Sequence, residues 1–155
     1  MKNAFLTITL AIAAHLAFAQ THFSAYSETT GKGLKTGIMT GHVFELVYPG
    51  YATYDFAVGG FFQHEIPNAI ANENAIASVR EKVLYGAYAE LMFNSSNRFS
   101  MAFNLRTGIQ NGEGFVIAPM IKTRYEFLPK AHVELGISSR NVVSPTLSYG
   151  ISFQF

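Results

Sequence analysis

The last eleven residues of the chain, Pro145 to Phe155, read PTLSYGISFQF. Apolar or aromatic residues alternate there with small or polar ones, and the apolar set is Leu147, Tyr149, Ile151, Phe153 and Phe155. Because successive side chains of a strand point to opposite faces, this segment predicts a strand with one apolar and one polar face. Such a strand, ending on a phenylalanine, is typical of a barrel that closes in lipid.

The same alternation recurs upstream, between groups of turn-forming residues. Connections are expected near Gly31, Pro49, Asn94, Asn111, Pro129 and Arg140, and over the longer segment 65–78. Alternation is clear in residues 52–62, 83–93, 99–109, 115–127, 131–137 and 145–155, whereas the facing of 22–27 and 37–47 stays undecided. A tilted membrane strand needs about 9–11 residues, so eight strands are expected.

A soluble antiparallel sandwich or a lipocalin-like barrel would also alternate, with its apolar face inward. Two features favour a membrane barrel instead. The polar faces are poor in lysine and glutamate and rich in small residues, which suits a crowded lumen. Aromatic residues also gather near the expected strand ends, as in an interfacial girdle; they are Tyr48, Tyr51, Tyr54, Phe93, Phe99, Tyr125, Phe127, Phe153 and Phe155. The sequence therefore predicts an all-β fold, an eight-stranded antiparallel transmembrane up-and-down β-barrel.

Residues 1–19 have the features of a secretory signal peptide. A lysine at position 2 precedes an apolar run over residues 4–14, and Ala17-Phe18-Ala19 matches the small-x-small cleavage rule. We expect cleavage before Gln20, so that the barrel comprises residues 20–155. The chain has no cysteine, which excludes a lipoprotein anchor and a disulfide framework.

Composition after residue 19 excludes two further classes of protein. Basic and acidic side chains are equal in number there, and no run of lysine and arginine occurs, so a nucleic-acid-binding protein is not indicated. No run of 18 apolar residues occurs either, which argues against a helical membrane protein.

The signal-like start, the eight alternating segments and the terminal YGISFQF resemble the small eight-stranded outer-membrane proteins of the OmpX and OmpA-barrel kind. This resemblance covers residues 20–155. It implies the outer membrane of a Gram-negative bacterium, contact with membrane lipid and lipopolysaccharide, and recognition of the strand ending at Phe155 by the barrel-assembly machinery. It implies no cofactor.

We expect the terminal phenylalanine at the periplasmic rim, and the connections then alternate between the two sides. The periplasmic turns are those at Pro129, Asn94 and Pro49. The external connections are those at Gly31, 65–78, Asn111 and Arg140. Segment 65–78 is either a plain surface loop or a contact site for a surface partner, because loops on rigid barrels often carry binding.

Charged side chains on the inner face are expected to pair, because side chains fill an eight-stranded barrel. The turn at 128–130 sets Arg124 opposite Glu134 and Glu126 opposite His132. The turn at Asn111 sets Arg98 opposite Glu126 and Ala102 opposite Lys122, and the turn at Asn94 sets Glu90 opposite Ala102 or Ser100. The expected lumen ion-pair network is Glu90, Arg98, Lys122, Arg124, Glu126, His132 and Glu134.

The residues therefore favour a non-enzymatic outer-membrane barrel with a filled lumen, acting in envelope integrity or in surface interaction. One alternative is a lipid-modifying enzyme, similar to a lipid A acyl hydrolase or transferase, in which Ser152, His132 and Glu126 serve as nucleophile, base and orienting carboxylate. Two points argue against this enzyme: the sequence offers no candidate for an oxyanion hole, and the three residues would face the packed lumen. The second alternative is a narrow, porin-like pore. His22, His42 and His64 have no ligand spacing, so no metal site is expected.

Overall fold

The computed structural model describes residues 20–30, 33–46, 54–67, 82–94, 98–112, 114–140 and 144–155. These residues form eight strands: β1 (Gln20–Thr30), β2 (Gly33–Leu46), β3 (Tyr54–Pro67), β4 (Lys82–Asn94), β5 (Phe99–Gln110), β6 (Gly114–Leu128), β7 (Ala131–Arg140) and β8 (Ser144–Gln154). Among them there is no helix with the length and hydropathy that crossing a membrane requires. The expected signal peptide, and the part of segment 65–78 that follows Pro67, lie outside the described residues.

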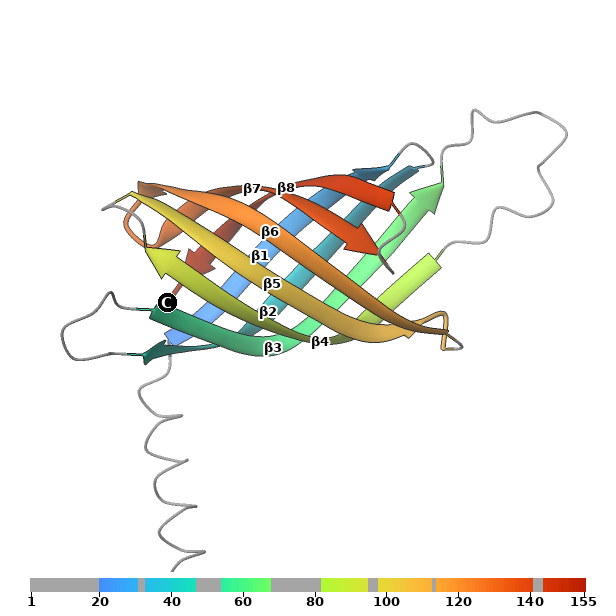
Figure 1. Ribbon diagram of the computed structural model, residues 1–155, viewed down its shortest axis with the longest axis horizontal. Helices are drawn as coiled ribbons and strands as arrows, with labels where there is room; N and C mark the ends of the chain where they lie inside the picture. The colour runs from blue at the N-terminus through green and yellow to red at the C-terminus, as the bar shows by residue number, and fades with distance from the viewer. Residues whose placement is uncertain are drawn as a thin grey trace, which may run out of the picture.

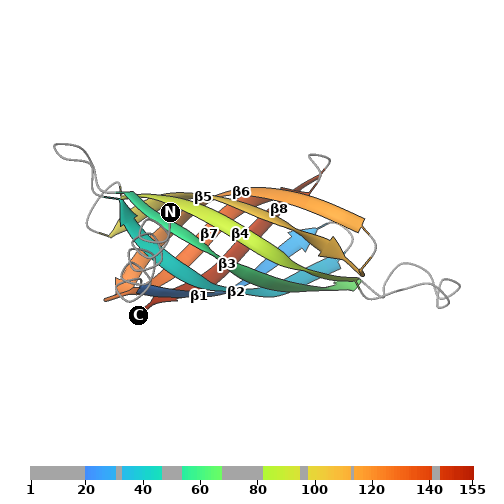
Figure 2. The same cartoon turned by 90° about the horizontal axis from the view of Figure 1, so that it is seen from below.

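Each strand pairs antiparallel with the next, and β1 pairs with β8, so the sheet closes into a barrel of tilted strands (Figures 1 and 2). The end of the chain takes part in this closure, because the Phe155 N–H donates to the Thr21 carbonyl oxygen at 2.9 Å. A closed sheet leaves no row of unpaired backbone groups, which lipid would penalise. The predicted fold, an eight-stranded antiparallel up-and-down barrel, is confirmed.

The barrel has an apolar outside and a polar inside. Along β6, exposed Phe115, Ile117 and Ile121 alternate with buried Lys122 and Arg124. The same holds for β8, where the apolar residues that alternate in the sequence all point outward. The facing predicted for 99–109, 115–127 and 145–155 is therefore confirmed. In 131–137 it holds except at Ala131, expected on the outer face, which is buried beside the turn.

Aromatic pairs surround the end of the barrel at which the chain terminates. Their ring centroids lie 5.5 Å apart for Tyr54 and Phe93, and 4.9 Å apart for Phe99 and Tyr125. Phe153 and Phe155 stack at 6.4 Å on the last strand. Tyr48 and Tyr51, expected in the same girdle, lie outside the described residues.

The lengths of two connections explain why one predicted strand register is correct and another is wrong. The turn between β6 and β7 is tight, with Lys130 at a φ of 63°, and it places Arg124 opposite Glu134 and Glu126 opposite His132 as expected. The predicted partner of Glu90 is wrong, because Glu90 lies opposite Asn104 rather than Ala102 or Ser100. The pair nearest that connection is Asn94 and Ser100, so the link is longer than the tight turn assumed.

Candidate functional site

The middle of the lumen holds four charged side chains that we call the central cluster: Glu90 of β4, Lys122 and Arg124 of β6, and Glu134 of β7. Lys122 Nζ lies 2.9 Å from Glu90 Oε2 and 2.9 Å from Glu134 Oε2. Arg124 Nε lies 3.2 Å from Glu134 Oε1. All four side chains are buried. Two positive and two negative charges thus neutralise one another, as burial of ionised groups requires.

Neutral polar side chains from three other strands extend this cluster. Asn104 Nδ2 of β5 donates to Glu90 Oε2 at 2.7 Å, and Ser24 Oγ of β1 donates to Glu134 Oε2 at 3.1 Å. Arg124 Nη2 donates to Ser152 Oγ of β8 at 3.0 Å. The Ser24–Glu134 and Arg124–Ser152 hydrogen bonds join strands that are not neighbours in the sheet, β1 with β7 and β6 with β8, and they brace the barrel from within.

A second buried group, the Arg106–Glu28 pair, links β5 to β1. Arg106 Nη2 donates to Glu28 Oε1 and, at 2.9 Å, to Ser138 Oγ. Gln63 Nε2 donates to Glu28 Oε2 at 2.9 Å. The guanidinium carbon also lies 4.9 Å from the centroid of the Tyr26 ring, within the range of a cation–π interaction.

Apolar and aromatic side chains occupy much of the remaining interior. They form one buried cluster, which consists of Tyr26, Met39, Val43, Ala57, Phe61, Leu84, Tyr88, Met92, Ala102, Val116 and Met120. Glycines make room for the largest of them. A Cβ atom at Gly37 would lie 2.6 Å from Tyr26 Cζ, so the tyrosine ring needs a glycine beside it. The interior of the described barrel is thus a packed core, as expected for eight strands.

Four of the seven residues expected in the lumen network form the central cluster, and three lie elsewhere. His132 is half-buried at its margin, with Nδ1 3.4 Å from Arg124 Nη2. Glu126 belongs to the β6–β7 turn, where its carboxylate accepts a hydrogen bond from the Lys130 N–H at 2.8 Å. Arg98 is exposed beside β5, and its carbonyl oxygen accepts a hydrogen bond from the Glu126 N–H at 2.9 Å.

Sequence reasoning missed the Arg106–Glu28 pair. Glu28 lies in the first strand, whose facing stayed undecided because its outward positions include Thr21, Ser27 and Thr29. The signal that would have found the pair is the polar character of the inward positions in the same strand, which are His22, Ser24, Tyr26 and Glu28.

The alternative catalytic residues lie on three adjacent strands but are not arranged as a relay. The Ser152 hydroxyl is fully buried and accepts a hydrogen bond from Arg124. The His132 ring faces the same guanidinium, and the Glu126 carboxylate binds the Lys130 N–H. A serine nucleophile needs a base at its hydroxyl, and Arg124, a permanent cation, cannot accept the proton.

His22 joins the central cluster and brings a set of potential metal ligands together. One ligand atom each of His22, Glu90 and Glu134 lies within 4.8 Å of the others, and all three residues are buried. His22 Nδ1 is also 3.0 Å from the Tyr88 hydroxyl. Lys122 Nζ, however, bonds to both carboxylates, so an ammonium group supplies the positive charge that a metal ion would bring.

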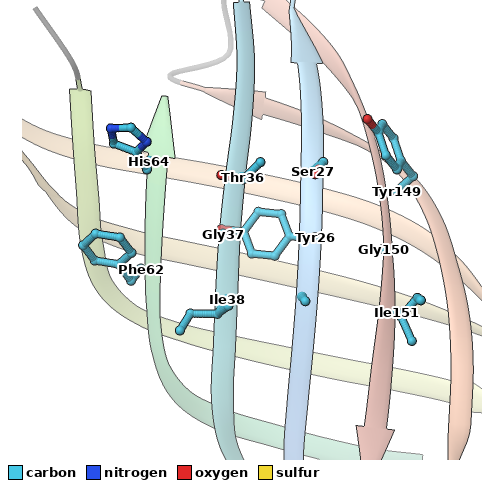
Figure 3. A pocket seen from close by; sticks show the side chains of 11 residues that line it. Tyr26, Ser27, Thr36, Gly37, Ile38, Phe62, His64, Tyr149, Gly150 and Ile151 are labelled. Carbon is cyan, nitrogen blue, oxygen red and sulfur yellow. The ribbon is translucent and has the colours of Figure 1, made fainter. Parts of the chain in front are cut away.

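The outer wall carries a hollow of about 600 Å³ over β1. Ala25, Ser27 and Thr36 are the small side chains in its lining, and taller ones surround them (Figure 3). Ile38 and Phe62 lie on one side of β1, and Tyr149 and Ile151 lie on the other; we call this feature the β1 hollow.

Comparisons with known proteins agree on the fold. No family model matches the sequence, and no curated protein matches it. The outer-membrane protein Ail of Yersinia pestis, whose structure was determined in a phospholipid bilayer nanodisc, is 12% identical over 88% of this chain and 99% of Ail, with a TM-score of 0.58. The de novo designed TMB2.3 is 13% identical over 88% and 94% of the two chains, with a TM-score of 0.58. A further designed transmembrane β-barrel is 9% identical over 88% and 94%, with a TM-score of 0.55. The chain thus has the fold of small transmembrane β-barrels.

Proposed function

We propose that the chain is a non-enzymatic outer-membrane barrel that contributes a closed, rigid cylinder to the cell envelope and presents its external connections for interaction. The observation that carries the proposal is the reversed distribution of side chains. Neutralised ion pairs are buried inside, whereas large apolar side chains such as Phe103, Ile121 and Leu135 are exposed outside.

The exterior supports a location in lipid. A soluble monomer rarely exposes apolar patches larger than a few hundred Å². Here exposed apolar side chains lie on seven of the eight strands, and the aromatic pairs at the terminal end suit an interface between lipid and water. The outer membrane itself is part of the proposal, together with contacts to its lipid and lipopolysaccharide and recognition of the Phe155 strand by the assembly machinery. Its supports are the fold of Ail and the signal-like residues 1–19.

The ion pairs that cross the lumen favour a structural role for the barrel and argue against a pore. Arg106 of β5 bonds to Glu28 of β1, and Lys122 of β6 bonds to Glu90 of β4, so side chains span the interior at two levels. The charges compensate one another within each level. An ion passing through would have to break these pairs, and breaking one buried pair costs about 3–5 kcal/mol.

The interaction role rests on the connection from β3 to β4. Pro67 and Lys82 end and begin these strands on the side opposite Phe155, and the segment between them is long compared with the β6–β7 turn. We propose that segment 65–78 contacts a surface partner, since external connections on a rigid barrel are free to vary without loss of the fold.

Conductance measurements on the full chain in planar lipid bilayers test the proposal. The wild type should insert, migrate faster on gels before heating than after, and conduct no measurable current. Steady single-channel currents from the wild type would contradict the closed lumen. Unchanged lipid A on expression of the protein, measured by mass spectrometry, is also expected, and loss of an acyl chain would favour the enzymatic alternative.

A further inference from the structure

A small cavity lies at the rim of the barrel where the chain ends. Its volume is about 240 Å³, and we call it the rim pocket; its lining consists of Arg98, Glu126, Phe127, Leu128 and Pro129. The β6–β7 turn that forms much of this lining contacts the last strand, because the Gln154 N–H donates to the Lys130 carbonyl oxygen at 2.9 Å. The rim pocket therefore lies on the side of the barrel that we expect to face the periplasm.

The guanidinium group of Arg98 can bind an anion in this pocket. Arg98 is exposed, and it forms no ion pair with any residue that the structure describes. Its backbone is fixed, since its carbonyl oxygen accepts a hydrogen bond from the Glu126 N–H at 2.9 Å. A guanidinium group has five N–H donors in a planar fork that matches the oxygens of a phosphate group. Arg98 is thus suited to a phosphate ligand.

Glu126 brings a negative charge to the same pocket. Its Oε1 atom accepts a hydrogen bond from the Lys130 N–H at 2.8 Å, which holds the carboxylate in the turn. Within the described barrel no ion pair joins this carboxylate to Arg98. The rim pocket therefore presents a positive and a negative charge that do not neutralise each other by contact. A head group with both a phosphate and an ammonium group complements the two charges.

Apolar side chains lead from the rim pocket to the outer wall. Phe127 and Leu128 are 44% and 60% exposed, and the rings of Phe99 and Tyr125 lie 4.9 Å apart close by. Such aromatic rings mark the level of the lipid head groups. Pockets that enclose a whole ligand usually measure roughly 300–1,000 Å³, so the smaller rim pocket suits a head group whose acyl chains extend along the wall.

We propose that the rim pocket binds the head group of one phosphatidylethanolamine molecule, with its phosphate at Arg98 and its ammonium group at Glu126. The inference rests on the proposed location in an outer membrane and on the expected orientation of the barrel. Ligand and location agree, because phospholipid forms the periplasmic leaflet of an outer membrane, whereas lipopolysaccharide lies in the external leaflet.

The combination of charges distinguishes the rim pocket from the hollows in the outer wall. The lining of the β1 hollow contains no lysine, arginine or carboxylate, and the hollow at Thr123 and Gly136 has no carboxylate in its lining. The same combination selects among phospholipids. Phosphatidylglycerol would place its phosphate near Glu126 without supplying an ammonium group to the carboxylate. Phosphatidylcholine has a quaternary ammonium group, which cannot donate a hydrogen bond.

Native mass spectrometry tests the inference on the full chain, released from nanodiscs that contain equal amounts of phosphatidylethanolamine, phosphatidylcholine and phosphatidylglycerol. We expect the wild type to retain one phosphatidylethanolamine in preference to the other two lipids. Arg98→Gln removes the cation that binds the phosphate and should weaken retention by about tenfold or more. The side chain of Arg98 forms no ion pair with the described barrel, so we expect this variant to fold, and its mobility on gels before and after heating checks this.

Glu126→Gln separates recognition of the ammonium group from a structural role of the turn. The glutamine oxygen can still accept the Lys130 N–H, so the turn is kept while the negative charge is lost. We expect the ratio of phosphatidylethanolamine to phosphatidylglycerol retained by this variant to fall by about tenfold. A role confined to the turn would leave this ratio unchanged.

Lys82→Gln is the matched control, because Lys82 is an exposed cation at the start of β4, on the side of the barrel opposite Phe155. It should retain lipid as the wild type does. Equal retention of the three lipids by the wild type, equal retention by Arg98→Gln and Lys82→Gln, or an unchanged lipid ratio in Glu126→Gln would each overturn the inference while the membrane location stands. A chain that does not insert into any nanodisc would overturn the proposed function as well.

Discussion

Arg106 and Glu28 form a buried ion pair between β5 and β1, two strands on opposite sides of the eight-stranded ring. Their side chains are 1% and 3% exposed. Neither residue pairs with the other through the sheet, so the contact is made entirely across the lumen. The pair therefore braces two opposite walls of the barrel and does not set the register of any two neighbouring strands.

Replacing one member of this pair should destabilise the barrel strongly. Arg106→Met leaves Glu28 buried without its guanidinium, and Glu28→Met leaves the guanidinium without its carboxylate. Each change should lower the free energy of unfolding by about 3–5 kcal/mol. The double variant removes both charges and should recover most of the loss. Urea titration in detergent micelles measures all three, and additive losses in the double variant would show that the two side chains act independently.

Glu134 should be the most sensitive carboxylate of the central cluster. Its carboxylate forms ion pairs with Lys122 at 2.9 Å and with Arg124 at 3.2 Å, and it accepts a hydrogen bond from the Ser24 hydroxyl at 3.1 Å. Glu134→Gln removes the charge at nearly constant volume, and we expect a loss of about 3–5 kcal/mol, seen as a lower temperature of conversion on heat-modified gels.

Glu45→Gln is the matched control for that experiment. Glu45 is exposed on β2 and lies opposite another acid, Asp55, in the sheet. Removing its charge relieves a like-charge pair and should leave the conversion temperature unchanged or slightly raised. Equal destabilisation by the two substitutions would argue against an inward ionic brace.

The sequence predicts that Arg124 lies opposite Glu134 because the connection between β6 and β7 is short. Lys130 adopts a left-handed backbone conformation in this turn, and Arg124 pairs with Glu134 beyond a register shift between Glu126 and Leu128. The longer link after Asn94 leaves the pairing of Glu90 open by one step. Glu90 still reaches Lys122 because both side chains are long and point into the same narrow lumen.

Contacts across the lumen are harder to predict than contacts along the sheet. Arg106 and Glu28 are far apart in both sequence and strand order, and no local pattern joins them. Their meeting depends on the diameter and the stagger of the closed barrel, which are properties of all eight strands together. The β1 hollow is of the same kind, because it requires small residues on β1 beside tall ones on β8, β2 and β3.

Lys122 should exclude divalent metal ions from the central cluster. In Lys122→Met the carboxylates of Glu90 and Glu134 lose their shared ammonium, while His22 remains within 4.8 Å. Two carboxylates and one imidazole are suitable zinc ligands. We expect Zn²⁺ to stabilise this variant by about 2.7 kcal/mol at 100 times its dissociation constant. Thermal unfolding with Zn²⁺ or with a chelator measures the effect. Wild-type protein should show no difference, and a variant that is equally indifferent would show that the three groups cannot close around a metal ion.

Lysine substitutions at two depths along the outer face of β6 test whether a lipid bilayer surrounds the barrel. Ile121 lies midway along β6 and is 59% exposed, whereas Phe115 lies near the start of the same strand. A lysine in the middle of the hydrocarbon layer costs about 2–4 kcal/mol, and one near the interface costs about 0–1 kcal/mol. Ile121→Lys should therefore lower the free energy of unfolding in lipid vesicles by about 2–4 kcal/mol, and Phe115→Lys, on the same face of the same strand, should lower it by much less. In a barrel surrounded by water neither lysine would be desolvated. Losses of similar size at the two positions would therefore count against a bilayer around β6.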